Sequence, residues 1–157
     1  MKILITLLCL MNGLFLCSAQ EKNSENKKFN QKLADSLGAD NYGMKSYKII
    51  ILKTGAKDKE ITDKTKKAEL FNGHFANMEK MSKEGKLVVA GPFNDNHLKY
   101  RGIFILDVKT DEEAKNFIDQ DPTVKAGVFD YEILPWYGSA ALPLYLKYHD
   151  QVAKENP

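Results

Sequence analysis

The chain has 157 residues, 43% of them hydrophobic, and its formal net charge at pH 7 is +2. This composition suits a globular protein with enough apolar residues for a buried core. The nearly balanced charge gives no reason to expect binding to nucleic acid or to an anionic membrane.

Residues 1–19 have the pattern of a secretory signal peptide: Lys2 is followed by an apolar run, and Ala19 is a small residue suited to cleavage. We therefore predict export, to the periplasm or the exterior, with no membrane contact after cleavage. A membrane anchor is the alternative, but the apolar run is short for a transmembrane span. A lipid on Cys17 is a further alternative, although Leu16 before it is bulkier than a lipoprotein signal normally tolerates.

Both cysteines, Cys9 and Cys17, lie inside this segment, so the mature chain is expected to have no disulfide and no thiolate. Residues 20–43 then form a polar leader that is charged and poor in apolar residues. Within it, Phe29, Leu33 and Leu37 are spaced by four and precede Gly38, which predicts a short amphipathic helix with a glycine stop.

Alternating strand and helix patterns predict one compact domain over residues 44–137. Strand-like, β-branched or apolar segments occupy residues 47–54, 87–90, 102–108 and 128–136. A helical period of three and four covers residues 66–84, and acidic residues 111–113 open a second helix. We expect Gly91-Pro92 to end the second strand, Asp121-Pro122 to end the second helix, and Pro135 to stop the last strand.

The resulting order, β-α-β-β-α-β, predicts a ferredoxin-like α+β fold: a four-stranded antiparallel sheet with both helices on one face. The first strand is apolar on both alternations, so residues such as Tyr47, Ile49 and Ile51 would be left uncovered on the helix-free face. We therefore predict a homodimer that forms through this face.

His74 lies in the apolar arc of the first predicted helix, where it is either a core histidine, a boundary residue or a functional group. Asp121, before Pro122, is a common turn initiator, but in this fold the two helices lie side by side, so its carboxylate can meet His74. A carboxylate on one ring nitrogen would fix the tautomer and raise the basicity of the other nitrogen. The two residues are our candidate acid/base pair.

Three segments, GHFANMEKMSKEGKLVVAGPF, DEEAKNFIDQDP and KAGVFDYEILPWYG, together resemble the YCII-related family of small dimeric α+β-barrel proteins over residues 47–137. The resemblance implies that His74 and Asp121 line the active-site pocket and that Gly91-Pro92 is the family's Gly-Pro. Many relatives carry an arginine where this chain has Asn72. Some act as lyases or dehydrohalogenases on ring compounds, and neighbouring families include isomerases and monooxygenases.

We place Gly91, Pro92, Met78 and Arg101 around this pocket. No cofactor and no metal are predicted, because the chain lacks a glycine-rich phosphate loop, a GxSxG elbow and an HExxH motif, and its histidines have no metal-ligand spacing.

Residues 138–157 form a C-terminal extension whose leucines and tyrosines should pack on this domain or on a neighbouring subunit. A role in closing the pocket is the alternative. The sequence thus predicts an exported YCII-like protein that binds or transforms a small organic molecule by proton transfer, as a lyase or isomerase. The alternative is a non-catalytic ligand-binding or interaction domain that keeps the pocket as a scaffold.

Overall fold

The computed structural model describes residues 28–152 and 154, so the predicted signal peptide and the start of the leader lie outside the described residues. The strands are β1 (Met44–Thr54), β2 (Leu87–Pro92), β3 (Tyr100–Leu106) and β4 (Phe129–Ser139). The helices are α1 (Gln31–Leu37), α2 (Lys64–Lys83), α3 (Asp111–Ile118), α4 (Pro122–Lys125), the 3-10 helix η1 (Leu142–Tyr145) and α5 (Leu146–Val152). No helix among these residues is long and apolar enough to cross a membrane.

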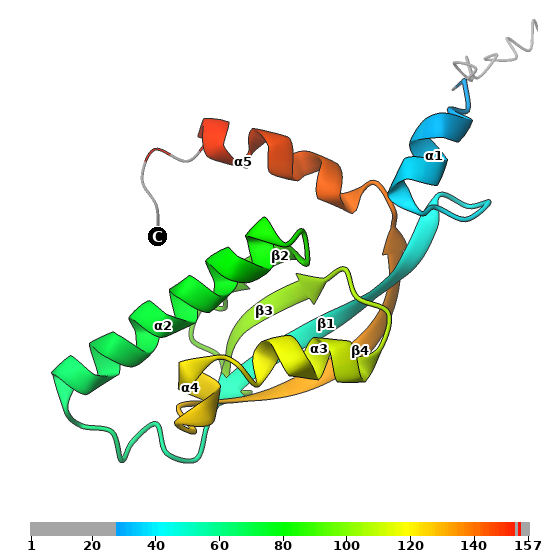
Figure 1. Ribbon diagram of the computed structural model, residues 1–157. Coiled ribbons are helices and arrows are strands. Elements are labelled where there is room, and N and C mark those ends of the chain that lie inside the picture. Colours follow the sequence, from blue (N-terminus) through cyan, green and yellow to red (C-terminus); the bar gives the residue numbers. More distant parts are fainter. Residues whose placement is uncertain (1–27, 153, 155–157) are drawn as a thin grey trace, which may run out of the picture.

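The four strands form one antiparallel sheet in the order β2-β3-β1-β4, with α2, α3 and α4 on the same side of it (Figure 1). The predicted ferredoxin-like α+β fold is therefore confirmed. β1 lies between β3 and β4, as its continuous apolar pattern indicated, and Ile50 is paired with both Phe104 and Ile133.

The core lies between the sheet and the helices. Ile50 and Phe104 from the sheet pack there with Met81 of α2 and Ile118 of α3, and all four side chains are buried. Apolar residues recur on α2 and α3 at helical spacing and on the strands at every second position, so both kinds of element present an apolar face to this layer.

The ends of three predicted strands are wrong. The third predicted strand, residues 102–108, lies two residues earlier, as β3. β4 continues through Pro135 to Ser139, and β2 includes Gly91-Pro92. Both are the outer strands of the sheet. An outer strand has one side without a partner, so a proline that donates no hydrogen bond is tolerated there.

The helix-free face of the sheet is apolar in its middle, and the Lys53–Glu132 ion pair lies at one end of it. Tyr47 is fully buried at the other end, where its ring packs 5.6 Å from that of Trp136 and its hydroxyl donates to the Ser139 carbonyl over 2.9 Å. Burial, assisted by the nearby Asp107 carboxylate, raises the pKa of Tyr47 to about 12. Further along the face Ile49 and Ile105 are half-buried, and Leu134 is 45% exposed.

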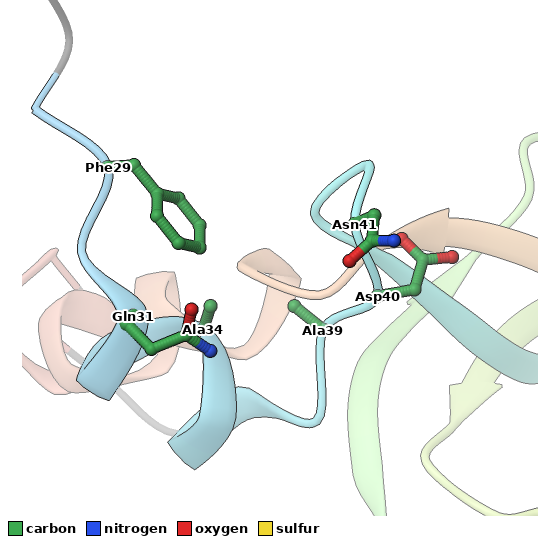
Figure 2. A pocket seen from close by; sticks show the side chains of 6 residues that line it. All are labelled: Phe29, Gln31, Ala34, Ala39, Asp40 and Asn41. Carbon is green, nitrogen blue, oxygen red and sulfur yellow. The ribbon is translucent and has the colours of Figure 1, made fainter.

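The two ends of the described chain add helices outside the sheet and its helical layer. α1 ends at Gly38 in the left-handed conformation (φ 67°), as predicted, and it projects away from the sheet (Figure 1). A hollow of about 390 Å³ lies between α1 and the segment leading to β1, with Phe29 on one side and Asp40 and Asn41 on the other (Figure 2). At the other end, the Tyr145 hydroxyl donates to the Val88 carbonyl of β2, which ties the C-terminal extension to its own domain.

Candidate functional site

The candidate site begins with His74, which α2 holds against the sheet. Asp63 caps the N-terminus of α2 by accepting hydrogen bonds from the backbone N–H groups of Thr65 and Lys66 over 2.8 and 3.1 Å. Eleven positions along the chain from this cap, His74 lies on the buried side of the helix and is only 7% exposed. The buried position of His74 on this helix was correctly predicted from the apolar arc.

Asp121 reaches the site by a route that differs from the prediction. α3 ends at Ile118, and Asp121 does not close it but caps the N-terminus of the separate helix α4. Its Oδ1 atom accepts hydrogen bonds from the backbone N–H of Thr123 over 2.8 Å and from the Thr123 hydroxyl over 2.6 Å. Pro122 is favoured at the first helical position because its missing N–H needs no partner there.

His74 and Asp121 meet in the interior. Nδ1 of His74 lies 2.5 Å from Oδ2 of Asp121, and the Asp121 side chain is fully buried. An ionised carboxylate only accepts hydrogen bonds, so Nδ1 carries the proton of this bond and Nε2 is left with the free lone pair in the neutral ring. Burial by itself raises the pKa of Asp121, but the hydrogen bonds from His74 and Thr123 outweigh it and leave the pKa below its ordinary value near 3.8.

Gly73 allows the two helices that carry the pair to approach closely. A Cβ atom at Gly73 would lie 2.6 Å from Cγ of Pro122, well inside van der Waals contact. Gly73 is not among the site residues predicted from the sequence. The available signal was a glycine in the middle of a helix, which costs about 1 kcal/mol relative to alanine and therefore points to a packing requirement.

Four phenylalanine rings surround the imidazole. The ring of Phe104 stacks on His74 with centroids 5.9 Å apart, and Phe71, Phe75 and Phe129 lie edge-on to it at 6.3, 5.6 and 5.4 Å. Among the described residues Nε2 has no hydrogen-bond partner, and no fully buried side-chain nitrogen or oxygen there lacks one. Nε2 is thus not fully buried, although its surroundings are apolar.

The other predicted site residues do not line one common cavity. Met78 lines a groove of about 580 Å³ between α2, β2 and the C-terminal extension, whereas Gly91, Pro92 and Arg101 do not line it. The Arg101 guanidinium packs over the Phe129 ring, 5.3 Å from its centroid, with Nη1 3.8 Å from Oδ2 of Asp58. The hollow beside α1 contains none of the predicted residues. In the described part of the chain, no group of three or more His, Cys, Asp or Glu side chains could hold a metal ion.

Comparison with known proteins supports the resemblance seen in the sequence. The family model of the YCII-related domain matches residues 48–137, which is more than half of the chain. No curated protein matches this chain. A similar solved structure is 5-chloro-2-hydroxyhydroquinone dehydrochlorinase from Burkholderia phenoliruptrix AC1100 in complex with 2,5-dihydroxybenzoquinone, with 19% sequence identity and a TM-score of 0.42 over 59% of this chain and 93% of that one. The chain therefore belongs to the YCII-related family.

Proposed function

We propose that this YCII-related protein binds a small organic molecule and transfers a proton on that molecule. His74 is the general base, and Asp121 orients the imidazole and raises its basicity. The observation that carries the proposal is the 2.5 Å contact between Nδ1 of His74 and Oδ2 of Asp121 in a buried, apolar setting. A His/carboxylate couple of this kind needs no metal and no thiol to move a proton.

In the proposed step, Nε2 of His74 removes a proton from a C–H or O–H group of the substrate, and the electron pair of the broken bond stays on the substrate. The Asp121 carboxylate then stabilises the imidazolium that forms. Return of the proton to another substrate atom completes an isomerisation, whereas departure of a leaving group with an electron pair completes an elimination. The apolar rings around His74 favour a flat substrate and strengthen the charge interaction.

The alternative is a binding domain without catalysis. A binding role is favoured by the low exposure of His74, 7%, and by the three hydrogen bonds that Asp121 already accepts within the protein. On that proposal the pair stabilises the packing of α2 on α4, and any molecule that binds does so without a proton transfer.

A double-mutant cycle separates the two proposals. A thermal-shift screen of small ring compounds supplies a ligand or substrate, and His74→Ala, Asp121→Asn and the double variant are then compared with wild type. We expect each single variant to lose about 100-fold or more in kcat/KM and the double variant to lose little more, because the residues act as one unit.

Additive losses, or unchanged turnover in folded His74→Ala protein, would contradict the catalytic role. Far-UV circular dichroism of each variant checks that the loss is not caused by unfolding. A protein that binds a compound with equal affinity in all four forms and never transforms it would be the binding domain of the alternative.

We also propose export, on the pattern of residues 1–19, and a homodimer formed through the helix-free face of the sheet. The dimer is supported by the apolar side chains on that face, including Leu134 at 45% exposure.

We expect sedimentation velocity at micromolar concentration to give twice the chain mass for wild type and one chain mass for Leu134→Asp, because a buried, unpaired carboxylate is costly. Leu98→Asp, in the exposed loop before β3, is the control that should stay dimeric. Monomeric wild-type protein would refute the dimer.

A further inference from the structure

The groove of about 580 Å³ is lined by three elements: the helix α2, the outer strand β2 and the C-terminal extension. Its volume is in the range of small-molecule sites in proteins. The apolar part of its lining consists of Phe75, Met78, Leu87, Val88, Ala90 and Leu146.

The outer wall of this groove does not belong to the family domain, because the family match ends at residue 137 and the extension follows it. The extension is held in place by the Tyr145 hydroxyl, which donates to the Val88 carbonyl. The pairing of β2 with β3 shifts between Leu87 and Val89, which leaves Val88 at an irregular position of an outer strand. This chain therefore closes the groove with a segment of its own.

The lining indicates which chemistry would bind. The Phe75 and Tyr145 rings are 43% and 41% exposed, and with the Met78 thioether they offer a surface on which a flat ring packs well. At the rim, Nζ of Lys83 lies 2.5 Å from Oε1 of Glu79, so these two charges balance each other. Ser82 and His149 supply hydrogen-bonding groups at the same rim.

We propose that this groove binds a neutral one- or two-ring aromatic molecule that carries a hydroxyl group, and that the C-terminal extension is the wall that selects it. Binding here does not require proton transfer at His74, so the inference goes beyond the proposed function. The groove is nevertheless close to the candidate site, because the Phe75 ring that lines it lies 5.6 Å from the His74 ring between centroids.

The test uses the full chain and 2-naphthol as the probe, with methyl-labelled methionine observed by NMR. We expect the Met78 methyl signal, assigned with Met78→Leu, to shift on titration, because the ring binds against it, while Met44, which does not line the groove, stays in place. Leu146→Lys should weaken binding about tenfold or more, since it places a charge in the apolar wall. Tyr148→Lys, on the same helix but outside the groove lining, is the matched control and should bind as wild type does.

Ala90→Lys is a second variant, at an exposed position of β2 in the groove, and it should also weaken binding if Leu146→Lys fails to fold. A Met78 signal that does not move, or equal binding by the groove variants and the Tyr148→Lys control, would overturn the proposal. The readout is binding rather than turnover, so a protein with no catalytic activity at His74 would still give the expected result.

Discussion

Replacing Asp121 by alanine is expected to lower the free energy of unfolding by about 3–5 kcal/mol, a large fraction of the stability of a small domain. The carboxylate is fully buried and accepts hydrogen bonds from His74 Nδ1 and from the backbone and hydroxyl of Thr123. Alanine would leave all three donors in the interior without an acceptor, and each unpaired donor costs about 1–3 kcal/mol. Urea unfolding followed by circular dichroism measures the loss.

Asp63→Ala is the matched control, because Asp63 also caps a helix but lies at the surface, where it should cost only about 1 kcal/mol. Asp121→Asn keeps an acceptor for Thr123, so its loss of unfolding free energy should fall between the losses of the two alanine variants. Equal losses for Asp121→Ala and Asp63→Ala would mean that the pair with His74 adds nothing beyond an ordinary cap.

The same residue predicts how stability depends on pH. Because the pKa of Asp121 is lower in the folded protein than its ordinary value near 3.8, its stabilisation is fully present above that value and is lost as the pH falls below it. The difference in unfolding free energy between wild type and Asp121→Asn should thus shrink as the pH falls below about pH 4. A difference that grows as the pH falls would show that the direction of the shift is wrong.

Replacing Gly73 by alanine is expected to disrupt the His74–Asp121 contact with only a moderate loss of stability. The new Cβ would lie 2.6 Å from Cγ of Pro122, so α4 must move away from α2. Such overpacking costs about 1–3 kcal/mol, part of which the better helix propensity of alanine offsets. A shift of about 1 Å between the two side chains would lower any proton-transfer rate by about 100-fold.

The hydrogen bond itself provides a direct readout. NMR of the imidazole should show the Nδ1 proton of His74 far downfield in wild type and moved or lost in Gly73→Ala. Asn72→Ala, at the exposed neighbouring position of the same helix, is the control and should leave the signal in place. An unchanged signal in Gly73→Ala would mean that α4 adapts and that the glycine is not required for the contact.

The fold was predictable because its evidence is local in the sequence. The continuous apolar pattern of residues 47–54 indicated a central strand, and the apolar arc of the first predicted helix placed His74 on the buried side of α2. The ends of the outer strands were not predictable in this way. Pro135 is compatible with a strand only because β4 has a free side, which is a property of the sheet and not of the segment.

The sequence predicted the pair of His74 and Asp121 but not the side chains that surround it. A carboxylate near His74 followed from two neighbouring helices, yet the break after Ile118 that makes Asp121 a cap of α4 has no clear signal before Pro122. The rings of Phe104 and Phe129 come from strands that are distant in sequence from α2, and only the tertiary arrangement brings them to the imidazole. The groove depends in the same way on where the C-terminal extension lies.

Both outer strands of the sheet carry an obstacle to further strand pairing. On β4 it is Pro135, which offers no N–H to an incoming strand, and on β2 it is the irregular position of Val88, whose carbonyl is already occupied by Tyr145. Exposed strand edges are common starting points for aggregation, and these two devices protect the sheet against it. A chain shortened before Tyr145 would leave the Val88 carbonyl free to accept a hydrogen bond from an incoming strand, so we expect it to aggregate more readily.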